Sequence, residues 1–363
     1  MTVSLLVATI MSFSNTAYAE NTTTAGRISD AEIQQRLTRL DSPVDIRQNA
    51  ETVRQIKSYV IDAKVATQRI IGRTALYFPV FEHYLSVYRL PEQLKYLPIV
   101  ESRLQPTVRS HAGATGLWQF TGATARQYHL AVNAQVDERK DPIRATEAAV
   151  SYLSQLHNKY RDWALVLAAY NCGPSRVNQA IARAGGKKDY WTIHPYLPTE
   201  TQNYVPRFIA ASYLMKHYQD HGLVPSYPSY QLQVTRTVKV FNRLSFQDIA
   251  RAANTSIEII EALNPGYRQA YIPTSLTGHY LILPEAAMQN FNRTKGGQVV
   301  AMNFTGASRK HVVQSGDTLE SIAKRFKCSV KDIQYWNSMD HDQVYFRQEL
   351  VLYTGGLGLG NRS

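Results

Sequence analysis

Apolar residues recur at helical spacing from about residue 29 to residue 88. Val53, Ile56 and Val60 share one stripe, and polar residues fill most positions between them. Residues three and four apart lie on the same side of a helix, so this spacing indicates an amphipathic helix with one buried face. We therefore expect residues 20–75 to form a helical lead-in to the domain that follows.

A longer helical pattern comes next, and no strand-like run interrupts it convincingly. Asp141-Pro142 combines a capping residue with a proline in the first turn, which is typical of a helix start. Asp162 is a second capping residue, and the segment 163–169 after it is almost wholly apolar. Such a helix belongs in the centre of a compact domain. The pattern predicts an all-helical domain over residues 76–220.

Proline and serine mark a change of organisation after this domain. Residues 225–230 read Pro-Ser-Tyr-Pro-Ser-Tyr, so we interpret residues 221–236 as a linker. Short strand and helix segments then occur twice, over residues 237–284 and 310–354. A second linker is expected between them, at residues 285–309.

The two short segments are copies of each other. In the first copy, residues 238–240 and 280–283 are strand-type runs around two helical patterns, and the second copy repeats this order. Asp317 stands three residues before Glu320, a capping-box spacing at a helix start. The matching positions align without a gap: Phe246, Ile249, Ala250, Ile257, Ile260 and Asn264 onto Leu319, Ile322, Ala323, Val330, Ile333 and Asn337.

This repeated unit resembles the LysM module, a small βααβ fold that binds glycans containing N-acetylglucosamine. The second copy carries the characteristic start, Val-Val-Gln-Ser-Gly-Asp-Thr-Leu, at residues 312–319. The first copy has Asn-Arg-Leu-Ser at residues 242–245 instead, which leaves its glycan affinity open. Fold alone does not establish binding, so a small structural domain that binds nothing is the alternative for both copies.

The charge of the chain limits the classes of molecule that it is expected to bind. A net charge of +12 and a pI near 9.5 favour an acidic polymer, such as nucleic acid, anionic lipid or a cell wall bearing carboxylates. No run of Lys and Arg is present, so we do not expect nucleic acid. The two cysteines, Cys172 and Cys328, are too few for a disulfide framework, and no His-Glu-x-x-His zinc motif occurs. We expect no metal and no cofactor.

The N-terminus is typical of a secretory signal. Residues 5–11 are apolar, and Ala-Tyr-Ala at residues 17–19 is a small-x-small cleavage site, so we expect residues 1–19 to be removed. No Lys or Arg precedes the apolar run, which leaves the true start open. No later run approaches about 20 apolar residues, so no transmembrane segment is expected. At the other end, residues 355–363 are expected to form a flexible tail.

One glutamate is a candidate for chemistry. Glu101 follows Ile99 and Val100 in a helical context, so we expect its burial against apolar neighbours. Desolvation raises the pKa of a carboxyl group and keeps it protonated near neutral pH. A protonated carboxyl group can donate a proton to a leaving glycosidic oxygen, which is the task of a general acid. By itself, however, a glutamate in a helix is usually solvated.

Two further motifs accompany this glutamate. Gly113, Gly116 and Gly122 allow a loop to bring its backbone close to an extended ligand. Farther on, Tyr170 and Asn171 end the apolar helix before a Gly-Pro stop. A hydroxyl and an amide at this place can orient a carboxyl group and hold an N-acetyl group.

Glu-Ser at residues 101–102, Gly-Leu-Trp-Gln at 116–119 and Ala-Tyr-Asn at 169–171 occur in this order on a helical background. Together with the LysM copies, this set resembles the lytic transglycosylases with a goose-lysozyme-like catalytic domain. The resemblance covers about residues 29–353. It implies a multidomain protein, with an all-α lysozyme-like catalytic domain followed by two βααβ LysM-type modules. It also implies an exported, periplasmic enzyme that is associated with the cell wall and acts on peptidoglycan.

The resemblance implies roles for single residues. Glu101 would be the single general acid and base, with Ser102 and Tyr170 beside its carboxyl group. Cys172 departs from the family, which usually has alanine there. The remaining implied residues contact the muramoyl sugar, line the cleft or close it: Ser110, Gly116, Gln119, Asn171 and Glu200.

The implied reaction needs only one carboxyl group. Glu101 would protonate the bond between N-acetylmuramic acid and N-acetylglucosamine, and the substrate's own N-acetyl group would stabilise the cation. Glu101 would then take the proton of the C6 hydroxyl, which closes a 1,6-anhydro ring without water. Three alternatives remain: a lysozyme-like muramidase that admits water, a non-catalytic wall-binding protein, and a chitin-active enzyme.

Overall fold

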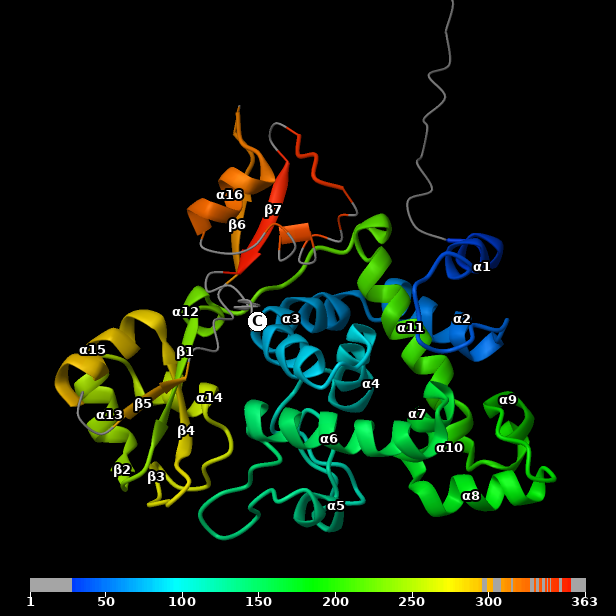
Figure 1. The fold of residues 1–363 in the computed structure, drawn as a ribbon, viewed down its shortest axis with the longest axis horizontal. Helices are drawn as coiled ribbons and strands as arrows, with labels where there is room; N and C mark the ends of the chain where they lie inside the picture. Colours follow the sequence, from blue (N-terminus) through cyan, green and yellow to red (C-terminus); the bar gives the residue numbers. More distant parts are fainter. Residues whose placement is uncertain are drawn as a thin grey trace, which may run out of the picture.

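The computed structural model describes residues 28–295, 299–302, 308–314, 316–326, 330, 333–334, 337, 339, 341–345 and 348–353. The predicted signal at residues 1–19 and the predicted tail at 355–363 lie outside the described residues, and so does Cys328. Figure 1 shows a helical body next to a smaller module that contains a sheet. The predicted architecture, a helical domain followed by small modules with strands, is confirmed.

Eleven helices make up the helical body within the described residues. They are α1 (Asp30–Leu37), α2 (Ala50–Lys57), α3 (Lys64–Val87), α4 (Leu97–Ser102), α5 (Gly122–Gln127), α6 (Pro142–Tyr160), α7 (Trp163–Cys172), α8 (Pro174–Arg183), α9 (Tyr190–Ile193), α10 (Thr199–Gln202) and α11 (Tyr204–His217). Shorter turns of other helix types lie between them: the π-helix Ser58–Asp62 and the 3-10 helices Glu92–Tyr96, His194–Tyr196 and Gln219–His221.

Helix α7 is the centre of the helical body. Its residues 164–169 are buried, and α6, α8 and α11 pack against it. The carboxylate of Asp162 accepts a hydrogen bond from the amide of Leu165 at 2.8 Å, which confirms Asp162 as the cap of this helix. Asp141 caps α6 in the same way, with Pro142 in the first turn. Capping of free amides and burial of an apolar helix therefore set the frame around the site.

The lead-in is part of the same body. Ile33 of α1 and Ile56 of α2 are fully buried in the core that also holds α7, and α2 packs against α11. Helix α3 crosses the predicted boundary at residues 75 and 76, so one helix serves both segments.

The segment predicted as a linker at residues 221–236 is packed onto α3. The amide of Ser226 donates to the carbonyl of Gln68 at 2.9 Å. A Cβ atom added to Gly72 would lie 1.8 Å from the carbonyl oxygen of Ser226, so only glycine permits this approach. Helix α12 (Tyr230–Gln233) and the start of β1 also fall in this segment. Proline and serine thus mark an ordered connection.

The first module, residues 235–302, follows the predicted order of strand, helix, helix and strand. Strand β1 (Thr235–Val240) pairs antiparallel with β4 (His279–Pro284), and these strands contain the predicted runs at 238–240 and 280–283. Helices α13 (Phe246–Ala253) and α14 (Ile257–Leu263) lie between them in the chain, together with the short pair β2 (Leu244–Ser245) and β3 (Tyr271–Ile272).

The prediction of a linker at residues 285–309 is wrong for much of its length. Helix α15 (Glu285–Lys295) packs against α13, and its Met288 and Phe291 are buried in the core of the first module. Strand β5 (Val299–Met302) pairs with the free side of β1, which gives the sheet order β4-β1-β5. An unpaired strand edge and an open apolar face both favour such additions.

The second module, residues 308–353, has its own apolar core, which includes Leu319, Ile322 and Leu350. Strands β6 (Ser308–Val312) and β7 (Glu349–Tyr353) pair antiparallel, and α16 (Leu319–Phe326) lies between them in the chain.

The predicted capping box of Asp317 and Glu320 is wrong by one residue. Thr318 and Ser321 form the reciprocal hydrogen bonds at the start of α16. The carboxylate of Asp317 instead accepts from the amide of Gln314 and contacts the ring of His311 at 2.7 Å. Asp317 therefore bonds residues that precede the helix, and Thr318 takes the capping position.

Candidate active site

Glu101 lies in the last turn of the short helix α4. Pro98 stands in the first turn of this helix, and Leu97 and Ile99 are buried beneath it. Arg103 ends the helix in the left-handed conformation, with φ of 52°. The apolar residues hold the helix against the core, so Glu101 is presented on a rigid element.

The carboxyl group of Glu101 has a shifted pKa. Burial raises the pKa of Glu101 to about 7, a hydrogen bond from Tyr204 opposes this rise, and the charge of Glu200 adds to it. The donor is the Tyr204 hydroxyl, and the acceptor is Oε1 of Glu101. Glu101 as a whole residue is partly exposed, so its carboxyl group is desolvated without being sealed off from a ligand.

Tyr204 was missed as a site residue by the sequence analysis. It opens α11 and is buried, and burial together with the charge of Glu101 raises its own pKa well above the ordinary value. It stands 103 positions from Glu101 in the chain. Its only sequence signal was its place four residues after Glu200, which the resemblance implied as a site residue.

Tyr170 ends α7 and lies within electrostatic reach of Glu101. Burial raises the pKa of Tyr170 well above its ordinary value, and the charge of Glu101 raises it further. The Tyr170 hydroxyl donates to the carbonyl oxygen of Trp118 at 2.8 Å. Tyr170 therefore joins the end of α7 to the loop at residues 110–120, which we call the Gly-Leu-Trp-Gln loop.

Ser102 joins α4 to the same loop. Its hydroxyl lies 2.9 Å from the carbonyl oxygen of Leu117 and 3.0 Å from that of Pro98. The resemblance implied a position beside the Glu101 carboxyl group. In the structure, the hydrogen bonds of the Ser102 side chain go to these backbone carbonyls, so Ser102 joins the loop to α4.

The Gly-Leu-Trp-Gln loop is held tightly at two positions. Gln119 has φ of 48°, and its side-chain amide donates to the carbonyl of Gly116 at 2.8 Å. Gly116 has φ of 91°, and a Cβ atom there would lie 1.8 Å from the carbonyl oxygen of Arg139. Ser110 is exposed, and its hydroxyl accepts from the amide of Ala114 at 3.1 Å.

Trp118 is a core residue rather than an exposed platform. Its side chain is fully buried, its indole N–H donates to the hydroxyl of Thr146 at 2.9 Å, and its ring meets that of Phe81 edge to face. This explains a tryptophan inside an otherwise glycine-rich loop. The indole anchors the loop in the core, because a buried tryptophan needs both apolar contacts and a hydrogen-bond acceptor.

Asn171, near the end of α7, and Glu200, on α10, are connected through Thr201. The hydroxyl of Thr201 on α10 donates to Oδ1 of Asn171 at 2.7 Å, which fixes the orientation of the Asn171 amide. Glu200, the neighbour of Thr201, is exposed, and its charge reaches Glu101. Cys172 is a free, partly buried thiol whose pKa is raised by burial.

The structure thus brings Glu101, Tyr170 and Glu200 into electrostatic contact. Ser102 and Tyr170 bond the Gly-Leu-Trp-Gln loop, which also carries Ser110, Gly116 and Gln119. Asn171 bonds Thr201, the neighbour of Glu200. One carboxyl group with a raised pKa and a hydroxyl donor is an arrangement that can release and recover a proton near neutral pH.

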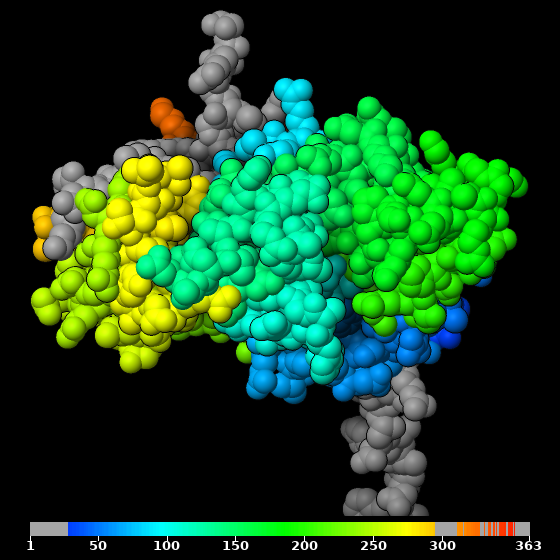
Figure 2. All heavy atoms as spheres, turned by 90° about the horizontal axis from the view of Figure 1, so that it is seen from below, coloured from blue at the N-terminus to red at the C-terminus, as the bar shows by residue number. Residues whose placement is uncertain are grey.

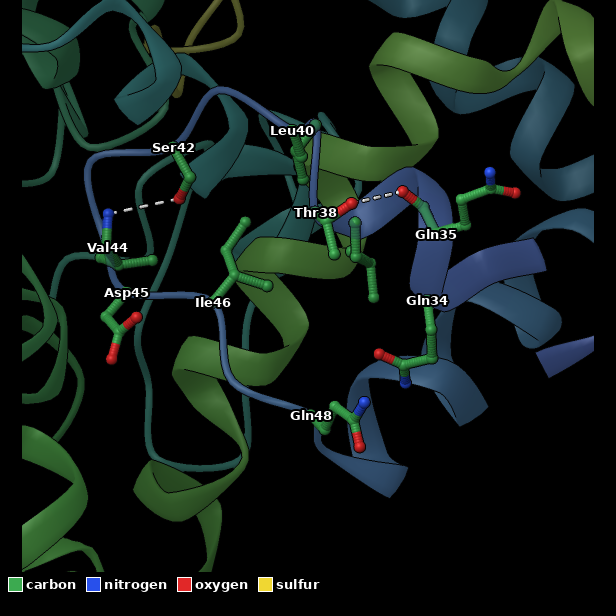
Figure 3. Close-up of a pocket in the computed structure, with 10 residues that line it drawn as sticks. Gln34, Gln35, Thr38, Leu40, Ser42, Val44, Asp45, Ile46 and Gln48 are labelled. Carbon is green, nitrogen blue, oxygen red and sulfur yellow. Dashed lines mark hydrogen bonds between the residues drawn. The ribbon is translucent and has the colours of Figure 1, made fainter. Parts of the chain in front are cut away.

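A separate hollow of about 460 Å³ lies between α1 and the segment that leads to α2 (Figure 3). Polar side chains such as Gln34, Gln48 and Asp45 line it. None of the predicted site residues takes part, so the hollow is not where Glu101 acts.

Within the part of the chain that the structure describes, no group of three or more His, Cys, Asp or Glu side chains could hold a metal ion. No helix of that part combines the length and the apolar character that crossing a bilayer requires.

Three known domain families match successive parts of the chain. The transglycosylase SLT domain matches residues 80–193, the LysM-like domain of lytic transglycosylase MltD matches residues 234–296, and the LysM domain matches residues 311–352. The first match contains Glu101 and the Gly-Leu-Trp-Gln loop.

Two curated relatives come from Escherichia coli. The membrane-bound lytic murein transglycosylase D is 32% identical over 278 residues, which cover 73% of this chain and 61% of that protein. The chain thus spans about three-fifths of the length of this relative. The soluble lytic murein transglycosylase is 27% identical over 141 residues, which cover 37% of this chain and 22% of that protein.

Solved structures give a weaker match. The 70 kDa soluble lytic transglycosylase of E. coli superposes with a TM-score of 0.33 at 23% identity, over 40% of this chain and 25% of that chain. This score supports no conclusion about the fold. The domain families give the clearer result: residues 80–193 of the helical body match the transglycosylase SLT domain family, and an MltD-type LysM-like domain and a LysM domain follow.

Proposed function

We propose that this protein is a peptidoglycan lytic transglycosylase. It cleaves the β-1,4 bond between N-acetylmuramic acid and N-acetylglucosamine and leaves 1,6-anhydromuramic acid ends. The proposal rests on the position of the Glu101 carboxyl group, because burial there raises its pKa to about 7. The SLT domain match over residues 80–193 and the similarity to a lytic murein transglycosylase support it.

The first step uses Glu101 as an acid. At neutral pH a large share of Glu101 is protonated, so it can donate its proton to the glycosidic oxygen as the bond to C1 breaks. The N-acetyl group of the substrate supports the positive charge at C1. The Tyr204 hydroxyl stays hydrogen-bonded to Oε1 and stabilises the carboxylate that this step leaves behind.

The second step uses the same group as a base. The Glu101 carboxylate accepts the proton of the muramoyl C6 hydroxyl while O6 bonds to C1, which closes the anhydro ring and restores protonated Glu101. The nucleophile is part of the substrate, so its effective concentration is high and no water is consumed. One carboxyl group whose pKa lies near the working pH can serve both steps.

The other predicted residues have supporting roles in this proposal. Gln119 and Asn171 contact the muramoyl sugar, Ser110 and Gly116 line the cleft, and Glu200 closes it. The second module binds glycan, and the protein works in the periplasm in association with the cell wall. The LysM match over residues 311–352 supports the glycan-binding role.

The test is Glu101→Gln on purified sacculi, with products identified by mass spectrometry. We expect turnover to fall about a thousandfold or more, because amide nitrogen can neither donate nor accept the proton. Glu258→Gln, at an exposed position in the first module, is the matched control and should retain activity. Anhydro ends support the proposal, whereas reducing ends would identify a muramidase. Retained activity of Glu101→Gln would contradict the role of Glu101.

A further inference from the structure

The loop between α5 and α6, residues 131–141, holds a buried ion pair outside the site. The Asp137 side chain is 2% exposed and that of Arg139 is 9% exposed. Nε and Nη2 of Arg139 donate to the two carboxylate oxygens of Asp137, each at 2.8 Å. Burial acts to raise the pKa of Asp137, but the hydrogen bonds and charge of Arg139 outweigh it, so the pKa is lowered and the pair stays ionised.

On its inner side, this ion pair holds the Gly-Leu-Trp-Gln loop. Nη1 of Arg139 donates to the carbonyl of Gly113 at 3.1 Å and, more weakly, to that of Phe120 at 3.5 Å. The backbone carbonyl of Arg139 packs against Gly116 where a side chain would otherwise lie. The two ends of the loop and its middle therefore all depend on where Arg139 is placed.

On its outer side, the ion pair is held by the first module. Nη2 of Arg268 donates to Oδ2 of Asp137 at 2.9 Å. The amide of Asp137 donates to the carbonyl of Gly266 at 2.7 Å, and the amide of Arg268 donates to the carbonyl of Gln135 at 2.9 Å. Figure 2 shows the yellow atoms of the first module lying directly against the teal atoms of the helical body. The module and the loop are thus joined through backbone and side chains.

The apolar contact between the two parts continues this junction. Tyr280 and Ile282 of β4 are buried in the core of the helical body, although their strand belongs to the sheet of the first module. A module that gave up this contact would expose both side chains, so it is held firmly in one position.

We propose that the first module is a positioning element of the catalytic site. Arg268 is its positioning residue, and it acts through Asp137 and Arg139 on the loop that carries Gly116 and Gln119. The inference rests on the proposed function, and it gives the first module a task other than gripping glycan. Arg268 is 40% exposed and its ion pair is partly screened, so the effect of this side chain alone is moderate.

The first test compares two substrates. Arg268→Met removes the guanidinium and keeps the aliphatic stem, and Arg251→Met is the matched control, because Arg251 is exposed and pairs within its own helix. A short soluble peptidoglycan tetrasaccharide can bind only at the proposed active site, whereas intact sacculi can also contact the two modules. We expect Arg268→Met to lower kcat on both substrates by the same factor, about three- to tenfold, with partial recovery in Arg268→Lys.

The second test needs no turnover. Amide hydrogen exchange of the free protein should become faster at residues 113–120 in Arg268→Met, and faster still in Asp137→Asn, which alters the same pair from the helical body. Arg251→Met should leave exchange there unchanged. Exchange that changes only at residues 133–141 and 264–272 would indicate a local structural contact and overturn the proposal.

If kcat falls on sacculi but not on the tetrasaccharide, the first module acts by binding glycan. This result would also overturn the proposal. The two proposals fail differently. If the unaltered protein releases no product from either substrate, the proposed function fails, whereas the hydrogen-exchange comparison still decides whether Arg268 positions the loop.

Discussion

Burial and two neighbouring side chains set the pKa of the single carboxyl group on which the proposed chemistry depends. Burial raises the pKa of Glu101, the Tyr204 hydroxyl lowers it, and the charge of Glu200 raises it again, with a result of about 7. A residue that must both give and accept a proton works best when its pKa lies near the ambient pH. Tyr204 therefore keeps the pKa from rising further, and Glu200 works in the opposite direction.

Removing the Tyr204 hydroxyl should move the pH dependence of the reaction. The hydroxyl donates to the ionised carboxylate, so Tyr204→Phe disfavours the ionised form and raises the pKa of Glu101 above about 7. The first step needs protonated Glu101, so kcat/KM falls as pH rises through this pKa. We expect that falling limb to move to higher pH by about one unit.

Tyr128→Phe provides the control for this experiment, because the Tyr128 hydroxyl bonds Gln155 at 2.5 Å and not Glu101. The limb should stay in place in that variant. An unchanged limb in Tyr204→Phe, measured from kcat/KM over the pH range, would mean that the hydrogen bond does not set the acid strength of Glu101.

At the scale of elements, the segment at residues 221–236, which the composition predicted to be a linker, is held by close backbone contacts. The chain that leaves α11 returns across α3, where its Ser226 carbonyl fills the space left by Gly72. That contact directs the chain into α12 and β1. The orientation of the first module against the helical body thus depends partly on one glycine in the middle of a long helix.

Gly72→Ala should destabilise the protein although alanine is the better helix former. A Cβ atom 1.8 Å from the Ser226 carbonyl oxygen forces the connecting segment away from α3. We expect the free energy of unfolding to fall by about 2 kcal/mol, because overpacking outweighs the gain in helix propensity. Urea denaturation measures this change.

Gly122→Ala is the matched control. Gly122 opens α5, its φ is not in the left-handed region, and the nearest atom to an added Cβ is the end of the Arg126 side chain at 3.6 Å. Its free energy of unfolding should change by less than about 1 kcal/mol. Equal effects in the two variants would show that the Ser226 contact does not restrict position 72.

At the scale of the whole molecule, the described residues form three apolar cores. The core of the helical body includes Tyr280 and Ile282 of β4, whereas the core of the second module contains no residue of the other two. The first module is therefore tied to the helical body, and the second module has a separate core, as is typical of an appended domain.

A chain that ends at residue 302 should retain the proposed activity and bind the cell wall more weakly. Its remaining cores are complete, so turnover of a short soluble glycan should stay within about twofold of that of the full chain. Retention on sacculi should weaken about tenfold, because linked binding sites add their effects. Cosedimentation with sacculi and turnover of the soluble glycan measure the two properties separately.

A chain that ends at residue 233 is the contrasting truncation. It removes β4, so the helical body loses the contacts of Tyr280 and Ile282 and should unfold at lower temperature.

Undiminished binding of sacculi by the chain ending at residue 302 would contradict the proposed role of the second module.

Much of this protein follows from local patterns in its sequence. Helical spacing, the caps Asp141 and Asp162, the repeated module and the three motifs around Glu101 are all readable because neighbouring residues determine secondary structure and its ends. The same patterns could not identify α15 as part of the first module, because its docking depends on an apolar face supplied by other segments.

Tertiary structure alone decided which distant residues meet. Tyr204 reaches Glu101 across 103 positions of the chain, and Arg268 reaches Asp137 across 131. The spacing of apolar and polar residues along the chain cannot predict such pairs, because they depend on how whole helices and strands pack. The sequence determined where the candidate acid, Glu101, stands in the chain. Packing decided the pKa of its carboxyl group and which module contacts the segment beside the Gly-Leu-Trp-Gln loop.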